Sequence, residues 1–98
     1  MRDLASLSAA DFRPLVGTVF AVVDGDGAGT ELRLSEVVIQ GVRPDHRQPF
    51  SLRLLGPRAP LLSQGIHRLT HAEMGVLELF FGPIASGPDA TTYEAVFG

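Results

Sequence analysis

Short β-type segments separated by turn residues constrain this chain more than any other feature. From Gly17 onward, stretches rich in β-branched, leucine and aromatic residues alternate with Gly- and Pro-containing turns. Parallel strands need crossover connections of about a dozen residues or more, and the links here are too short or irregular for crossover helices. The pattern therefore predicts a mainly β protein, a small antiparallel six-stranded barrel or roll. The expected strands span residues 18–24, 30–40, 50–55, 66–71, 76–84 and 92–97.

One short N-terminal helix is expected before the first strand. Ser8 and Asp11 have the spacing of a capping box, and Leu7 and Phe12 have the spacing of a hydrophobic staple. Pro14 lacks a backbone N–H group and disfavours helical geometry in the residue before it, so the helix should end after about one or two turns. The 98 residues suffice for one core, and we expect a single domain over residues 1–98.

Residues 76–81, VLELFF, place apolar side chains on both faces of one expected strand. If positions 77, 79 and 81 point inward, Val76 and Phe80 flank Glu78 on the opposite face. A strand that is apolar on both faces needs a cover on each of them. The short helix, the loop before the fourth strand, or another copy of the chain are the alternatives for that cover.

The last expected strand also needs a cover or a partner strand, because it ends the chain and is expected to lie at a sheet edge available for pairing. The chain is 45% hydrophobic, more than a core of this size is expected to hide. A GC-rich genome, which favours Ala, Leu and Val and replaces Lys by Arg, is an alternative explanation of that composition. The candidate interaction surface comprises Val76, Glu78, Phe80, Tyr93 and Val96.

Charge is distributed in blocks along the sequence. Residues 1–42 carry a net charge of −3, residues 43–68 carry +4 and residues 69–98 carry −4, for a total of −3. The central basic block has one aromatic residue, Phe50, and the whole chain is acidic, so we expect no nucleic-acid partner. Opposite blocks favour steering between subunits or toward a protein of complementary charge, and solvated faces are the simpler alternative.

A small-ligand-binding barrel is the alternative function. Arg53, Arg68 and His67 would surround a mouth closed by residues 56–65, GPRAPLLSQG, and would hold an anionic ligand.

The sequence predicts no metal and no cofactor. Asp24 and Asp26 stand at positions one and three of a calcium loop, but Ala28 and Ser35 occupy positions five and twelve, where oxygen and Glu ligands are needed. The segment is better explained as a plain hairpin turn. Its glycines precede a strand rather than a helix, so we expect no phosphate cradle.

Zinc and catalysis are also disfavoured. The chain has no Cys, and His67 and His71, four residues apart on a strand, would lie about 13 Å apart, too far to share one metal ion. Glu73 and Glu78 flank a turn without a predicted cleft, and no nucleophile motif is present. We therefore expect a protein that is not an enzyme.

No apolar run approaches the roughly 18–20 residues that a membrane-spanning helix needs, and the N-terminus lacks the hydrophobic stretch of a signal peptide. We expect a cytoplasmic protein without a membrane partner, and incorporation into a particle is compatible with that location.

Four segments carry a family resemblance: ADFRPLVG, PFSLRLLGP, PLLSQGIHRLTHAEMGVLELFFGPI and YEAVF. Over nearly the whole chain the sequence resembles a family of small bacterial single-domain proteins of unknown function, in which a strand like QGxYRLxHPxLGxLELFLVP precedes YEAVF. His67 and Ala72 stand where that pattern favours Tyr and Pro. The resemblance brings no catalytic residue, and it implies an accessory or assembly role near phage-tail-like collar or fibre proteins.

These observations lead to one principal hypothesis. We expect a non-enzymatic protein–protein interaction or assembly module whose partner is itself, as a homo-oligomer, or another protein.

Overall fold

A computed structural model describes residues 7–39 and 49–97 and confirms the predicted mainly β architecture. One short helix, α1 (Ala9–Phe12), runs into a 3₁₀ turn, η2 (Arg13–Leu15), and a second 3₁₀ turn, η3 (Gly25–Gly27), follows the first strand. The strands are β1 (Val19–Val22), β2 (Glu31–Ile39), β3 (Phe50–Pro57), β4 (Gly65–His71), β5 (Gly75–Ser86) and β6 (Ala90–Phe97).

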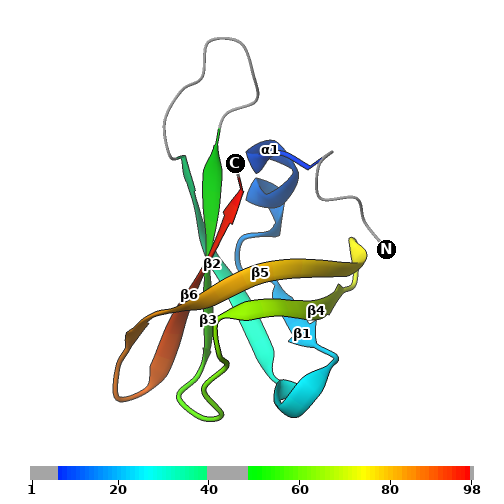
Figure 1. Cartoon of the computed structure of the whole chain (residues 1–98). Coiled ribbons are helices and arrows are strands. Elements are labelled where there is room, and N and C mark those ends of the chain that lie inside the picture. The colour runs from blue at the N-terminus through cyan, green and yellow to red at the C-terminus, as the bar shows by residue number, and fades with distance from the viewer. Residues whose placement is uncertain (1–6, 40–48, 98) are drawn as a thin grey trace.

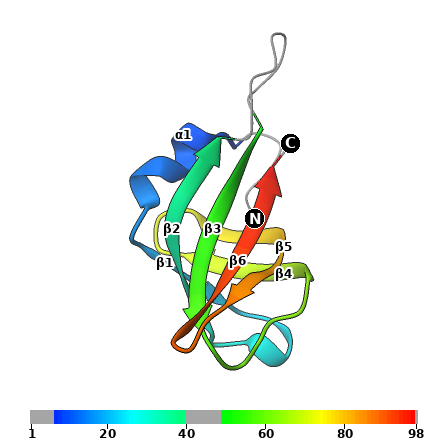
Figure 2. The ribbon, with the colours of Figure 1, turned by 90° about the vertical axis from the view of Figure 1, so that its left-hand side faces the viewer.

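The six strands form a closed barrel in the order β1-β2-β3-β6-β5-β4, and every neighbouring pair is antiparallel. In Figure 2, β2, β3 and β6 run side by side on the near side, and β4 and β5 cross behind them. The sequence left a barrel and a roll as alternatives, and the structure is the barrel. The expectation that the last strand lies at a sheet edge is wrong, since β6 pairs with both β3 and β5.

The core consists of inward-facing side chains of every strand, Phe12 from α1 and apolar residues outside the strands: Leu7, Leu15, Leu62 and Met74. Phe12 packs on Phe50 and Phe97 at centroid distances of 5.9 and 5.4 Å, and those two rings stack at 4.6 Å. The short helix therefore closes the barrel end where β3 begins and β6 ends (Figure 1). Burying one such aromatic side chain contributes roughly 1.5–3 kcal/mol to stability.

The local signals at the N-terminus act as predicted. The Ser8 backbone N–H donates to the Asp11 carboxylate at 2.8 Å, and the Ser8 hydroxyl donates to the same oxygen at 3.2 Å. Leu7 and Phe12 are both buried. Gly17 then adopts a φ of 93°, a left-handed conformation that glycine tolerates and that turns the chain into β1. Within the described residues, no helix has the length and apolar character needed to cross a membrane.

Candidate functional site

The outer surface of β4 and β5 is built by strand alternation and cross-strand register. Leu69, Leu77 and Phe81 point inward and are fully buried, so the residues between them point outward. The register places three outward pairs directly opposite one another: Ile66 with Phe80, Arg68 with Glu78, and Thr70 with Val76. We call these six residues the β4–β5 face.

The β4–β5 face exposes large apolar side chains. Ile66 is 68% exposed, Phe80 is 58% exposed and Val76 is 38% exposed. Between these apolar positions, an Arg68 Nη2 group donates to a Glu78 carboxylate oxygen at 3.1 Å, and both side chains keep more than 40% of their surface exposed. Such a solvent-exposed ion pair contributes only about 0–1 kcal/mol to folding, so the fold does not depend on it.

Val96 extends the exposed apolar surface onto β6. Phe81 pairs with Ala95, so Val96 lies beside Phe80, and it is 63% exposed. Ile66, Phe80 and Val96 thus form one line across three strands, which we call the outer apolar row. Next to it lies a groove of about 350 Å³, lined by Gln64, Phe80, Gly82, Pro83, Ile84, Glu94 and Val96.

The prediction that Tyr93 lies on this surface is wrong. Tyr93 is fully buried, its hydroxyl accepts the backbone N–H of Leu62 at 2.9 Å, and its ring meets Phe81 edge-on at 5.5 Å. Tyr93 and Val96 are three residues apart on one strand, so alternation sends them to opposite faces. Tyr93 instead holds the loop before β4 against the core, where Leu62 is buried and Leu61 is 60% exposed.

The three residues of the expected anion-binding mouth do not converge. Arg53 lies on the outer surface of β3 with its Nε group 3.0 Å from the carboxylate of Glu94, and Arg68 lies on the β4–β5 face. His67 points the other way. Its ring stacks on Phe81 at 4.5 Å, and its Nε2 atom lies 2.7 Å from the carbonyl oxygen of Ser63.

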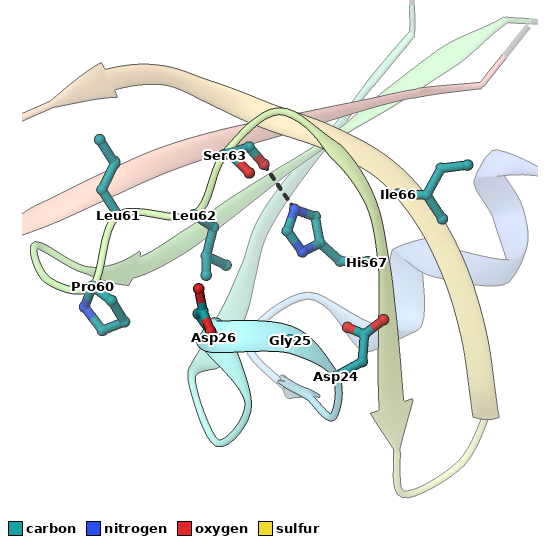
Figure 3. A pocket seen from close by; sticks show the side chains of 10 residues that line it. Asp24, Gly25, Asp26, Pro60, Leu61, Leu62, Ser63, Ile66 and His67 are labelled. Carbon is teal, nitrogen blue, oxygen red and sulfur yellow. Dashed lines mark hydrogen bonds between the residues drawn. The ribbon is translucent and has the colours of Figure 1, made fainter.

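His67 lines a separate pocket of about 450 Å³ near η3 (Figure 3). The pocket also contains the carboxylates of Asp24 and Asp26, and the Asp24 carboxylate accepts the backbone N–H of Arg68 at 3.1 Å. Neither Arg53 nor Arg68 contributes to its lining, so its charge opposes an anionic ligand. Among the described residues, no group of three or more His, Asp or Glu side chains is placed to hold a metal ion.

His71 connects the β4–β5 turn to the N-terminal segment. Its Nδ1 atom accepts the backbone N–H groups of Glu73 and Met74 at 3.0 and 3.3 Å. Its Nε2 atom lies 2.8 Å from the hydroxyl of Thr18, which itself donates to the Leu15 carbonyl oxygen at 2.6 Å. Because both ring nitrogens are engaged and the side chain is buried, His71 has a structural role.

The predicted interaction surface omits the three β4 residues of the β4–β5 face: Ile66, Arg68 and Thr70. All three fall in the predicted fourth strand, but none is assigned to the face of Phe80. A hairpin centred on Glu73 pairs position 66 with position 80, and that signal was available in the sequence.

The fold and surface define a small closed antiparallel β-barrel domain with one short N-terminal helix and an exposed apolar row on its outer wall. A family model described as a domain of unknown function, DUF6916, matches residues 7–97, and the chain belongs to this family. The resemblance to small domains of unknown function is therefore confirmed. Comparison with the curated proteins and with the solved structures gave no match.

Proposed function

We propose that this domain is a non-enzymatic protein–protein interaction module that docks a partner through the β4–β5 face and Val96. The outer apolar row carries the proposal, because its three side chains are each more than half exposed and adjoin one another across three strands. Single exposed apolar side chains are common on soluble proteins, whereas contiguous ones mark sites that a partner covers.

The surroundings of the outer apolar row support the same function. The Arg68–Glu78 ion pair borders it along β4 and β5, and Thr70 adds a further polar side chain on the same face. An apolar centre with a charged and polar rim is the usual anatomy of a protein–protein interface. The rim also provides a means of selecting a partner with complementary charge.

The setting that we propose is an assembly. The resemblance to small bacterial proteins found near phage-tail-like collar or fibre proteins favours an accessory part of such a structure, and the particle would then be the final location. An enzymatic function has less support, because the candidate reactive side chains do not form a common centre. Arg53 and Arg68 are each engaged in an ion pair with a glutamate, and His67 and His71 make separate contacts.

Site-specific photo-crosslinking in the native host tests the proposal. A photoreactive phenylalanine analogue at Phe80 replaces the aromatic side chain at the centre of the row, and illumination should yield a covalent adduct with a protein. The matched control carries the analogue at Val16, which is 45% exposed and follows η2, outside β4–β6. An adduct at position 80 that is absent at position 16 supports the proposal, and equal or absent adducts at both positions overturn it.

A further inference from the structure

We infer that the partner of the β4–β5 face is a second copy of this chain, packed face to face across a two-fold axis that runs between β4 and β5 and parallel to them. This inference rests on the proposed function, because it names the partner of the same surface. Two-fold symmetry is the commonest symmetry of protein oligomers, and it requires a patch that is complementary to itself.

The register of the hairpin provides that self-complementarity. A two-fold axis between the two strands places β4 of one copy over β5 of the other. Ile66 then covers Phe80 of the second copy, and Phe80 covers Ile66 of the second copy, because the two residues are direct cross-strand neighbours. The same operation pairs Thr70 with Val76. On each side of the axis, one contact therefore joins two apolar side chains, Ile66 and Phe80, and a second joins Val76 to Thr70.

Charge complementarity is the stronger argument. Arg68 and Glu78 are also direct neighbours across β4 and β5, so the same axis places Arg68 over Glu78 of the second copy and Glu78 over Arg68. The four charges then alternate in sign. A different protein would need an independently matched charge pattern, whereas a second copy carries the matching pattern by symmetry.

The contact that results uses side chains on the outer wall of the barrel. Stacked sheets of this kind lie about 10 Å apart with strand directions within roughly 30° of one another. Along the strands, the Arg68–Glu78 pair lies between the Ile66–Phe80 pair and the Thr70–Val76 pair, so a shift of one residue pair would place charged side chains over uncharged ones. Arg68 and Glu78 therefore fix the register of the two copies, and the contacts of Ile66, Phe80 and Val76 provide most of the affinity.

Charge-reversal variants test this geometry, with the association state measured by sedimentation equilibrium. Wild type should be a dimer. Arg68→Glu gives each face two carboxylates and Glu78→Arg gives each face two guanidinium groups, so each variant should weaken self-association by roughly a hundredfold or more. The double variant Arg68→Glu/Glu78→Arg restores opposite charges and should recover the dimer.

The two single variants should also rescue one another. Mixed in equal amounts, Arg68→Glu and Glu78→Arg chains place two carboxylates opposite two guanidinium groups, so they should form a mixed dimer although each alone is monomeric. Arg53→Glu is the matched control, because it also puts two acidic side chains side by side, next to Glu94, but outside the proposed contact. It should leave the wild-type dimer intact. Circular dichroism and thermal melting verify that every variant is folded.

Three results would overturn the inference: a wild-type monomer at roughly 1 mM, where even weak complexes form; folded Arg68→Glu and Glu78→Arg variants that remain dimers; or folded monomeric variants that fail to form the mixed dimer. None of these three results contradicts the proposed function, because the β4–β5 face could still bind a different protein. A crosslinked adduct at position 80 with a different protein would keep the interaction module and reject the second copy, whereas no adduct would reject the module.

Discussion

The outward-facing surfaces of two strand pairs, which we call the β3–β6 wall and the β4–β5 wall, each carry an ion pair, but in different surroundings. Each presents an Arg–Glu pair between directly opposite residues. On β3–β6, Glu94 contacts Arg53 at 3.0 Å and the hydroxyl of buried Ser51 at 3.4 Å, and its side chain is 23% exposed. On β4–β5, the Glu78 side chain is 41% exposed. The first pair belongs to a partly buried network within the chain, and the second leaves more of its surface exposed.

This difference indicates how one small barrel divides its outer wall. Both walls enclose the same core, yet only β4–β5 combines an open ion pair with the large exposed side chains of Ile66 and Phe80. Variants of the Arg53–Glu94 pair should therefore change the free energy of unfolding, and variants of the outward residues on β4–β5 should change association.

Phe80→Arg should abolish most of the association and leave the fold intact. A central aromatic residue of an interface contributes about 2–4 kcal/mol to binding, which corresponds to a dissociation constant raised by roughly thirtyfold to a thousandfold. Phe80 is 58% exposed, so its loss should change the free energy of unfolding by less than about 1 kcal/mol. Sedimentation and urea unfolding measure the two quantities.

The control for Phe80→Arg is Val16→Arg, which adds the same charge at an exposed apolar residue outside β4–β6. Val16→Arg should leave association unchanged. Equal weakening by both variants would mean that added positive charge, rather than the outer apolar row, governs association.

Tyr93→Phe should lower the free energy of unfolding and leave association unchanged, the opposite of Phe80→Arg. It removes the hydroxyl that accepts the Leu62 backbone N–H and leaves that buried donor without its partner, at a cost of about 1–3 kcal/mol. Urea unfolding should show this loss. Measured in the monomeric Phe80→Arg background, the effect is separated from association. A neutral result would show that the loop before β4 is held by the burial of Leu62 alone.

Glu94→Gln and Glu78→Gln compare the two ion pairs directly. Both substitutions remove one negative charge and keep the side chain's size. In the Phe80→Arg background, Glu94→Gln should lower the free energy of unfolding by roughly 1 kcal/mol, because Glu94 is partly buried and contacts both Arg53 and Ser51. Glu78→Gln should cost less than about 0.5 kcal/mol. Equal losses would remove the distinction between the two walls.

The strands were predictable because their boundaries are set by local chemistry. Gly29 and Gly75 adopt φ values of 92° and 76°, which glycine tolerates at a turn, and they stand close to strand ends as the sequence suggested. Closure of the barrel was harder to predict from the sequence, because the pairings of β1 with β4 and of β3 with β6 join segments far apart in the chain. The segment after β1 also differs from a plain hairpin turn, since it contains η3.

The residues of the candidate site were predictable only where alternation along a single strand determines which side chains point outward. Alternation within β5 places Val76, Glu78 and Phe80 outward, as expected. Two predictions are wrong because they conflict with that alternation. One places Tyr93 and Val96 on the same surface, although their odd spacing puts them on opposite faces of β6. The other places the neighbours His67 and Arg68 at one mouth, although successive strand residues point to opposite sides.

Salt dependence provides the smallest and most specific test of the division between the walls. The proposed dimer brings Arg68 and Glu78 of two copies together, so raising the ionic strength from about 0.05 to 0.5 M should weaken self-association by roughly threefold to tenfold. The outer apolar row should be insensitive to this change, so association should weaken without disappearing. A dimer of Arg68→Gln/Glu78→Gln chains, which lacks both charges, should lose most of that dependence, and Arg53→Gln/Glu94→Gln chains should keep it. If instead the second pair of substitutions removes the salt dependence, the β3–β6 wall is the one that meets the partner, and the assignment of the two walls must be exchanged.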